Sequence, residues 1–420
     1  MQNSLQMQKI AIIGAGVSGL TTARILQDRY DITVYERAAK HGGLIRCEHI
    51  GGSLFHTCGG HVFNTKNQDV AEWFWHQFNQ EADFRKADRN SVVQLEQALI
   101  PYPIENHVYM LDADTQRRFI ADCLSIACTN AGEPTDFESF LRGRFGDTLY
   151  NLYFKPYNEK VWHCDLKQVS LAWLEGKLPM PTVQEMLFNN FNHVEERQFV
   201  HSSFWYERQG GSQFIADTLA KGLNIRYNSD IRSLTFAGGK WHIADEAYDR
   251  VIWCGNIKDL PASLRGVNID AYTADIQSLP YHGTTTVFCE IDTNPYSWIY
   301  LPSDRYACHR IICTGNFAPS NNASTLPQGR ITATIEFTDA ISQADILANL
   351  ERMPFHPTYI THRFHPFTYP IQTASTRQMI QRLKHELANF NFLFTGRFAD
   401  WEYYNMDVAM AAAMKTCAAL

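Results

Sequence analysis

The hydrophobic pattern near the start of the chain predicts a strand, a helix and a second strand in immediate succession. Residues 9–13 (KIAII) form an apolar run that is too short for a helix and typical of a buried parallel strand. Residues 18–27 then carry apolar side chains at helical spacing, and residues 32–35 (ITVY) form a second apolar run that ends at Glu36. This order predicts a β-α-β unit, which belongs to a parallel sheet covered by helices.

The same patterns divide the rest of the chain into helical and strand-rich stretches. We expect helices over residues 70–78, 115–130, 377–389 and 407–419, and a mainly helical stretch over residues 136–195. We expect strands within residues 91–112, 223–255, 284–337 and 392–395. Residues 316–329 (NFAPSNNASTLPQG) are polar and rich in turn-forming residues, which predicts an exposed loop.

Composition and charge narrow the class of protein. A chain of 420 residues predicts two or three packed units, and 19% charged residues with 45% hydrophobic ones are typical of a globular protein. The net charge of −7 argues against nucleic acid as a partner, and no apolar run is long enough to span a membrane. Ten scattered cysteines without a C-x-x-C pair or a secretion signal predict reduced thiols and a cytoplasmic location.

A glycine fingerprint lies between the first strand and the first helix. Gly14, Gly16 and Gly19 make a G-x-G-x-x-G sequence, in which they serve a tight turn, close approach of a pyrophosphate and helix–strand packing, respectively. Ser18 lies in the first turn of the helix, whose amide groups and dipole favour an anion. Glu36 follows the second strand and can accept hydrogen bonds from ribose hydroxyls. The order of these features predicts a dinucleotide site; the alternative is a glycine-rich turn without a ligand.

Two further segments favour FAD over NAD. After Glu36 come Arg37 and the pair Gly42–Gly43 with Leu44, which together resemble the second FAD signature of amine-oxidase-like flavoproteins. Near the other end of the chain, Gly396 and Arg397 resemble the segment that returns to the flavin in such proteins. The alternative for Arg397 is a surface ion pair, which is common and contributes little.

Four longer segments resemble the UDP-galactopyranose mutase family of flavoenzymes. They are GGHVFNT at residues 59–65, PYPIEN at 101–106, FESFLRGRFGDTLYNLYFKPYNEKVW at 137–162 and GRFADWEYYNMD at 396–407. The resemblance runs from residue 9 to the C-terminus and is poorest over residues 180–205 and 265–370. The P-Y-x-x-K-x-W segment is its most specific part, since amine oxidases generally lack it.

What the resemblance implies is a redox-neutral reaction on reduced FAD. Members of the family interconvert the pyranose and furanose rings of a nucleotide-linked sugar, and N5 of the reduced flavin acts as the nucleophile at the anomeric carbon. This is nucleophilic catalysis in which the cofactor carries the chemistry and the protein supplies position and electrostatics.

The resemblance also assigns roles to individual residues. As catalytic residues it implies His61, Tyr157, Trp162, Tyr403 and Asn405. As FAD-binding residues it implies Gly14, Gly16, Ser18, Gly19, Glu36, Arg37, Gly43, Leu44, Gly60, His61, Gly396, Arg397, Tyr404 and Met406. As substrate-binding residues it implies Asn106, Tyr157, Trp162, Lys177, Trp298 and Tyr403. Core packing is the alternative for the aromatic residues, and a structural hydrogen bond is the alternative for His61.

The chain departs from the family where the diphosphate is held. Family members clamp it with two arginines, because a guanidinium matches phosphate geometry. In the lid loop Lys177 retains one positive charge, but Pro181 stands where an arginine is expected, and in the middle strand Trp298 stands where the other is expected. Arg305 or Arg310 is a candidate substitute. The substrate is therefore a nucleotide sugar or another glycosyl compound.

Two other functions stay open, and no metal site is expected. One alternative is an amine-oxidase-type FAD oxidoreductase; the other is a FAD-binding homologue without catalytic activity. His356, His362 and His365 do not follow a metal-ligand pattern, and Pro357 and Pro366 indicate a loop there.

The predicted architecture is α/β, with a Rossmann-like FAD domain of the glutathione-reductase type built from distant parts of the chain. We assign residues 1–70, 205–262 and 375–420 to this domain. Residues 113–200 are expected to form a mainly helical domain, and residues 80–112 and 263–374 an antiparallel-sheet domain that binds substrate. A homodimer is possible.

Overall fold

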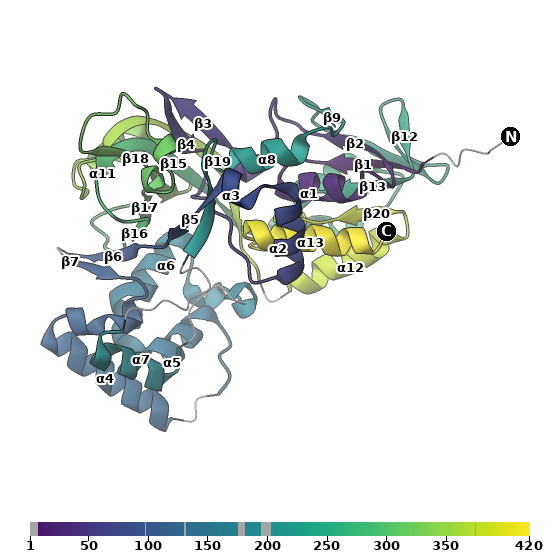
Figure 1. Cartoon of the computed structure of the whole chain (residues 1–420). Helices are drawn as coiled ribbons and strands as arrows, with labels where there is room; N and C mark the ends of the chain where they lie inside the picture. The colour runs from purple at the N-terminus through teal and green to yellow at the C-terminus, as the bar shows by residue number, and fades with distance from the viewer. Residues whose placement is uncertain (1–6, 97, 130–131, 175–180, 195–202, 374) are drawn as a thin grey trace.

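A computed structural model describes residues 7–96, 98–129, 132–174, 181–194, 203–373 and 375–420. Figure 1 shows three lobes: a parallel sheet between helices, a helical lobe below, and a second large sheet at the upper left. The first described strand, β1, and the last helix, α13, both lie in the lobe that contains the parallel sheet (Figure 1). The α/β class and the Rossmann-like domain predicted from the sequence are confirmed.

The parallel sheet has the strand order β20-β13-β1-β2-β9. Its strands are β1 (Lys9–Ile13), β2 (Asp31–Tyr35), β9 (Ile225–Arg226), β13 (Arg250–Trp253) and β20 (Phe392–Phe394). Ile10 and Ile12 pack toward helices α1 (Val17–Leu26), α8 (Gln213–Ala220) and α13 (Met406–Ala418). Ala11 and Ile13 face the opposite layer, which contains α12 (Thr376–Ala388). Both faces are therefore covered, as the continuous apolar runs predicted.

That opposite layer also contains a four-stranded sheet with the order β12-β11-β10-β14. Its elements are β10 (Leu234–Ala237), β11 (Lys240–Ile243), β12 (Glu246–Tyr248) and β14 (Leu264–Arg265), with α9 (Leu260–Ser263) and α10 (Asp270–Ser278). Trp241 is fully buried there, and its indole nitrogen donates to the Phe390 carbonyl over 2.7 Å.

The second large sheet has seven strands in the order β19-β15-β18-β17-β16-β6-β7. Its strands are β6 (Ser91–Leu95), β7 (Ala98–Pro101), β15 (Tyr281–Asp292), β16 (Trp298–Tyr300), β17 (Arg310–Ile312), β18 (Arg330–Thr338) and β19 (Thr358–Pro370). All its strand pairs are antiparallel except β6 with β16. Nearby lie α11 (Gln343–Leu350) and the pairs β3 (Cys47–Ile50) with β4 (Ser53–His56) and β5 (Phe84–Asp88) with β8 (Ser203–Glu207).

The helical lobe contains α4 (Ala113–Cys128), α5 (Phe137–Leu149), α6 (Lys155–Trp162) and α7 (Val183–Asn192). A π-helical turn over Tyr150–Phe154 joins α5 to α6. Two short 3-10 helices, Ile104–Asn106 and Leu166–Gln168, pack against α7 and α5, respectively. Helices α2 (Gln68–Gln77) and α3 (Gln80–Asp83) lie next to the lobe that contains the parallel sheet (Figure 1). The domain boundaries assigned from the sequence stay a prediction.

Two expectations from the sequence are wrong. The histidine-rich segment expected as a loop is strand β19, which accommodates Pro366 because β19 is an edge strand and its pairing with β15 is interrupted between His365 and Tyr369. The expectation that all of residues 316–329 form an exposed loop is wrong for the first part, where two 3-10 helices occur and Phe317 and Asn321 are buried, whereas residues 322–329 form the expected turns. Asn321 is tolerated inside because its amide donates to Tyr206 and to the Thr314 carbonyl.

Within the described residues, no helix is both long and apolar enough to cross a membrane.

Candidate functional site

A single large cavity of about 1220 Å³ connects the glycine fingerprint to the aromatic residues of α6. Its walls come from the carboxyl ends of β1 and β2, from α6, from the seven-stranded sheet and from the start of α13. It thus lies where the three lobes meet. Cavities of this kind at lobe junctions are typical of cofactor and substrate sites.

The fingerprint glycines form one end of the cavity. Gly14 has a φ of +107°, which glycine adopts without strain, and its amide donates to the Tyr35 carbonyl over 2.7 Å. A methyl group on Gly19 would lie 1.9 Å from the Gly14 carbonyl oxygen, so this glycine is required for helix–strand packing. Around Gly16, by contrast, the nearest protein atom to such a methyl group is 3.9 Å away. Space is therefore left beside Gly16 at the N-terminus of α1, where a ligand can approach the backbone.

Glu36 is held rigidly at the same end. Its carboxylate accepts hydrogen bonds from the amides of Ala15 and Ala38 at 2.8 and 2.9 Å. Only 8% of the residue is exposed, and it lines the cavity together with Arg37. A buried carboxylate fixed by backbone amides and facing an open cavity is suited to accept further hydrogen bonds from a ribose.

The middle of the cavity contains polar atoms without protein partners. Nε2 of His61 and Nε of Arg397 are buried, and neither has a hydrogen-bond partner among the described residues. Burial, together with the positive charge of Arg397, lowers the pKa of His61 to about 4. The imidazole is therefore neutral near pH 7, and a ligand with polar edge atoms would supply the partners that His61 and Arg397 lack.

Behind His61 lies a second buried histidine with a pH-dependent contribution to stability. Nε2 of His56 is 2.7 Å from the Tyr206 hydroxyl, and burial lowers the pKa of His56 to about 3. In the unfolded chain the His56 side chain takes up a proton near pH 6.5, whereas in the folded chain it does so only at a much lower pH. The stabilisation is thus present above pH 6.5 and is lost as pH falls, by about 2 kcal/mol between pH 7 and 5.

We expect the variant His56→Gln to show a weaker dependence of unfolding free energy on pH than the natural chain between pH 5 and 7. Urea denaturation at several pH values measures this difference. The exposed His385, replaced as His385→Gln, provides the matched control and should keep the slope of the natural chain. Equal slopes for His56→Gln and the natural chain would show that His56 is not the buried neutral group described.

Helix α6 carries the aromatic wall of the cavity. Tyr157 and Trp162 both line it; the Trp162 ring lies 6.4 Å from that of Tyr403, and the Tyr157 ring lies 5.3 Å from that of Tyr300. Lys160 lies between them in sequence and does not face the cavity. Its ammonium group donates to the carbonyls of Leu301, Ser303, Tyr306 and Cys308. The lysine of the P-Y-x-x-K-x-W segment thus fastens α6 to the seven-stranded sheet.

Most residues singled out from the sequence line this one cavity. They are Gly14, Gly16, Ser18, Gly19, Glu36, Arg37, Gly43, Leu44, Gly60, His61, Tyr157, Trp162, Trp298, Arg397, Tyr403, Tyr404, Asn405 and Met406. Their common location is what a cofactor next to a substrate requires, although their individual roles stay predictions.

Two of the singled-out residues are described but do not line the cavity, and a third is not described. Asn106 lies fully buried in a 3-10 helix (Ile104–Asn106) that packs against α7, so it does not line the cavity. Gly396 lies just behind the wall; its amide donates to Asp400, and a methyl group on it would lie 3.0 Å from the Ser18 hydroxyl. Lys177 is outside the described residues.

Several further arginines line the cavity, and two of them lie next to its aromatic residues. Arg310, one of the two candidates from the sequence, lines the cavity and forms an ion pair with the buried Glu336, whereas Arg305 does not line it. Arg89 was missed. It follows β5, and its guanidinium carbon lies 4.9 Å from the centre of the Trp298 ring. Arg89 therefore brings a positive charge next to the tryptophan that replaces the arginine of the resembled family.

The charges of these arginines differ in how far they are compensated. Arg310 is neutralised by Glu336, whereas Arg89 donates to the hydroxyls of Tyr300 and Ser91. Arg397 stacks on Tyr403 at 4.2 Å and donates to the Tyr404 carbonyl. Among the residues that the structure describes, Arg89 and Arg397 have no carboxylate within ion-pair distance. The guanidinium groups of Arg89 and Arg397 are therefore among those that the cavity offers to an anion.

Comparison with known proteins confirms the resemblance. Residues 12–78 match the family model "NAD(P)-binding Rossmann-like domain". Over 432 aligned positions the chain is 23% identical to the dTDP-fucopyranose mutase of Escherichia coli, covering 99% of this chain and 98% of that protein. It is also 23% identical to a probable UDP-galactopyranose mutase of Klebsiella pneumoniae, covering 97% and 94%.

Solved structures show the same fold. A reduced UDP-galactopyranose mutase superposes with a TM-score of 0.85 at 20% identity, covering 98% of this chain and 94% of that one. A putative protoporphyrinogen oxidase from Exiguobacterium gives 0.75 at 14% identity, covering 98% of each chain. The chain is therefore a full-length relative of proteins named as sugar mutases, and its fold is that of flavoenzymes, which supports a flavin cofactor.

Proposed function

We propose that this chain is a FAD-dependent mutase that interconverts the pyranose and furanose forms of a nucleotide-linked sugar. The observation that carries the proposal is the single cavity in which the dinucleotide fingerprint, the aromatic wall of α6 and the uncompensated guanidinium groups of Arg89 and Arg397 face one another. The names of the full-length relatives support the same class of reaction.

The residues of the cavity fit FAD. Gly16 and the first turn of α1 would receive the pyrophosphate, and Glu36 would accept the ribose hydroxyls. His61 and Arg397 would meet the polar edge of the flavin ring with the atoms that lack a hydrogen-bond partner among the described residues. When bound in its reduced form, FAD would supply the nucleophile for a reaction at the anomeric carbon.

We expect Gly16→Ala to stay folded but to bind FAD so weakly that its FAD content falls by a factor of about ten or more. The reason is that the added methyl group occupies the space through which the pyrophosphate approaches. The flavin absorbance per chain and the thermal midpoint measure the two effects separately. Gly19→Ala is the contrast: its methyl group would lie 1.9 Å from the Gly14 oxygen, so the thermal midpoint should fall as well. Full flavin content in Gly16→Ala would argue against the pyrophosphate position.

The substrate would lie between α6 and the flavin position. Arg89 would bind the diphosphate in place of the arginine that Trp298 replaces, with Arg310 beside it. Tyr157, Trp162 and Tyr403 would form the apolar walls against which the sugar and the base pack. The neutral imidazole of His61 would orient its neighbours by hydrogen bonds without adding charge.

The proposal is tested by turnover of a panel of UDP-, dTDP- and GDP-linked sugars, with the two ring forms separated by liquid chromatography. We expect ring interconversion with the chemically reduced protein, none with the oxidised protein, and no net consumption of oxygen or nicotinamide. Stoichiometric consumption of an oxidant during turnover would contradict the proposal and favour an oxidoreductase.

No observation favours either alternative function more strongly. Amine-oxidase-type oxidation often uses a lysine next to the flavin. Lys258 is the one lysine among the described lining residues, and its ammonium group already donates to the carbonyls of Ile276, Gln277 and Leu279. The intact aromatic wall, together with guanidinium groups that have no carboxylate partner among the described residues, argues against a cavity that has lost its ligand.

A further inference from the structure

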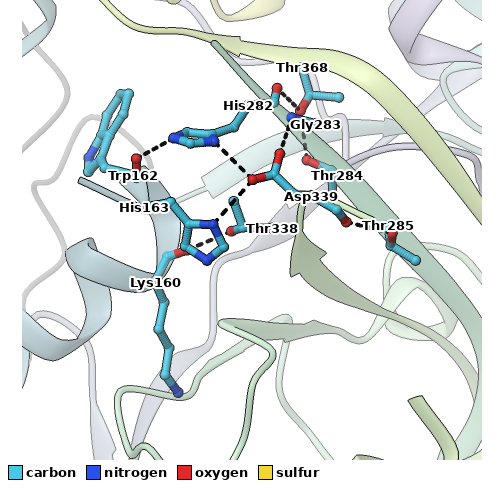
Figure 2. Close-up of polar contacts among 10 residues, drawn as sticks. All are labelled: Lys160, Trp162, His163, His282, Gly283, Thr284, Thr285, Thr338, Asp339 and Thr368. Carbon is cyan, nitrogen blue, oxygen red and sulfur yellow. Dashed lines mark hydrogen bonds and ion pairs between the residues drawn. The ribbon is translucent and has the colours of Figure 1, made fainter. Parts of the chain in front are cut away.

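Outside the cavity, three side chains converge that are far apart in sequence. His163 ends helix α6, His282 lies near the start of β15, and Asp339 follows β18. Nδ1 of His163 lies 3.2 Å, and Nδ1 of His282 lies 3.1 Å, from the same oxygen, Oδ2 of Asp339. Figure 2 shows both imidazole rings directed at that carboxylate.

The hydrogen bond to the Trp162 carbonyl places one proton of His282 on Nε2 and orients the ring. Its Nε2 faces the main-chain carbonyl of Trp162, which can only accept a hydrogen bond, so Nε2 carries the proton (Figure 2). In the neutral ring, Nδ1 then has a lone pair, which points at a carboxylate oxygen 3.1 Å away. A cation between these two atoms makes the contact favourable, and that cation is either a proton on Nδ1 or a metal ion bound by both side chains.

The distances fit a metal ion as the source of that charge. Zinc with nitrogen and oxygen ligands at about 2.0–2.1 Å in a tetrahedron places neighbouring ligand atoms about 3.3 Å apart. The two separations of 3.2 and 3.1 Å are close to this value, and all three ligand atoms lie within 4.8 Å of one another. A second oxygen of Asp339 accepts from the amide of Gly283 at 2.8 Å, which orients the carboxylate as supporting contacts do in metal sites.

We propose that His163, His282 and Asp339 bind a divalent transition-metal ion of the zinc type. Two imidazoles and one carboxylate make a ligand set typical of zinc, and the hydrogen bond from His282 to a carbonyl is the usual support for such a ligand. The side chains of His163 and Asp339 are 46% and 44% exposed, so the ion can enter from solvent and keep water as a fourth ligand. The sequence could not indicate this site, because its ligands are separated by 119 and 57 positions (282 − 163 and 339 − 282).

The ion would fasten the end of α6 next to the cavity. Trp162, which lines the cavity, immediately precedes His163, and its carbonyl is bound by His282. The ammonium group of Lys160 points away from the cluster in Figure 2 and binds other carbonyls, so it does not compete for Asp339. Metal binding would therefore join α6 to β15 and β18 and limit the movement of the aromatic wall.

Equilibrium dialysis of the purified, tag-free holoprotein against Zn²⁺, with metal analysis by mass spectrometry, tests the proposal. We expect about one zinc per chain, no comparable binding of Mg²⁺, and about 100-fold or greater weakening in His163→Gln and in Asp339→Asn. The exposed His49, replaced as His49→Gln, is the matched control and should bind zinc as the natural chain does. Absence of stoichiometric zinc, or equal binding by the natural chain and both ligand variants, would overturn the site.

Hydrogen exchange gives a second readout that does not depend on activity. Zinc should slow amide exchange over residues 155–163 in the natural chain and in His49→Gln, but not in His163→Gln. The fold of His163→Gln should be kept because this side chain is about half exposed. Zinc-independent exchange of this helix in the natural chain would contradict the proposed fastening of α6.

Discussion

The variant Arg89→Met is expected to bind the nucleotide sugar about 10- to 150-fold more weakly, while its FAD content stays that of the natural chain. Charge-assisted hydrogen bonds contribute about 1.5–3 kcal/mol each, which corresponds to this range of Kd. Arg89 stacks on Trp298 and has no carboxylate partner among the described residues, so its charge is available to the diphosphate. Titration of the oxidised holoprotein, followed by the flavin spectrum, measures the affinity.

Two further variants make this result specific. Arg89→Lys keeps the charge but loses the planar fork, so we expect only partial recovery of affinity. Lys86→Met removes an exposed cation from β5, the strand that precedes Arg89, and its affinity should equal that of the natural chain. Unchanged affinity in Arg89→Met would show that another group holds the diphosphate.

The variant Arg310→Met is expected to lose about 3–5 kcal/mol of unfolding free energy at pH 7, because it leaves a charge buried without its partner. The side chain of Glu336 is only 1% exposed, and the Arg310 guanidinium beside it holds the pKa of that carboxyl well below its usual range. A carboxyl with a lowered pKa stabilises the folded chain above its unfolded pKa, and this contribution is lost as pH falls. The loss of unfolding free energy in Arg310→Met should therefore be smaller at acidic pH than at pH 7.

The double variant Arg310→Met/Glu336→Gln separates stability from binding. It removes both charges together, so most of the unfolding free energy lost in Arg310→Met should return. Nucleotide-sugar affinity should remain reduced if Arg310 also contacts the diphosphate. Urea denaturation of the natural chain, of Arg310→Met and of the double variant measures the loss and the return of unfolding free energy. If Arg310→Met were as stable as the natural chain, the description of this ion pair would be contradicted.

The parts of the fold that depend on neighbouring residues could be predicted from the sequence. The strand, glycines, helix and acid of residues 9–36 are close in sequence, and the structure has them as β1, α1, β2 and Glu36. Helices α12 and α13 also lie within one residue of their expected positions, because their apolar periodicity is regular. In these segments the hydrophobic spacing and the turn-forming or charged residues predict the same elements.

What could not be predicted depends on contacts between distant segments. Strand β19 contains Pro366, which indicates a loop unless the residue is known to lie at a sheet edge. Arg89 reaches Trp298 because β6 pairs in parallel with β16, a pairing across about two hundred residues that leaves no local signal. The proximity of Arg89 to Trp298, on which its proposed role rests, is therefore visible only in the structure.

A trapping experiment tests the central claim most directly. The holoprotein is reduced with dithionite, mixed with UDP-, dTDP- or GDP-linked sugars and quenched with cyanoborohydride, and the extracted flavin is weighed by mass spectrometry. For a mutase that uses reduced FAD as its nucleophile, the flavin mass increases by that of one sugar residue with at least one donor, and Arg89→Met lowers the yield at limiting donor. An unmodified flavin with every donor, in a protein whose flavin is fully reduced and whose spectrum responds to the donor, would contradict the account.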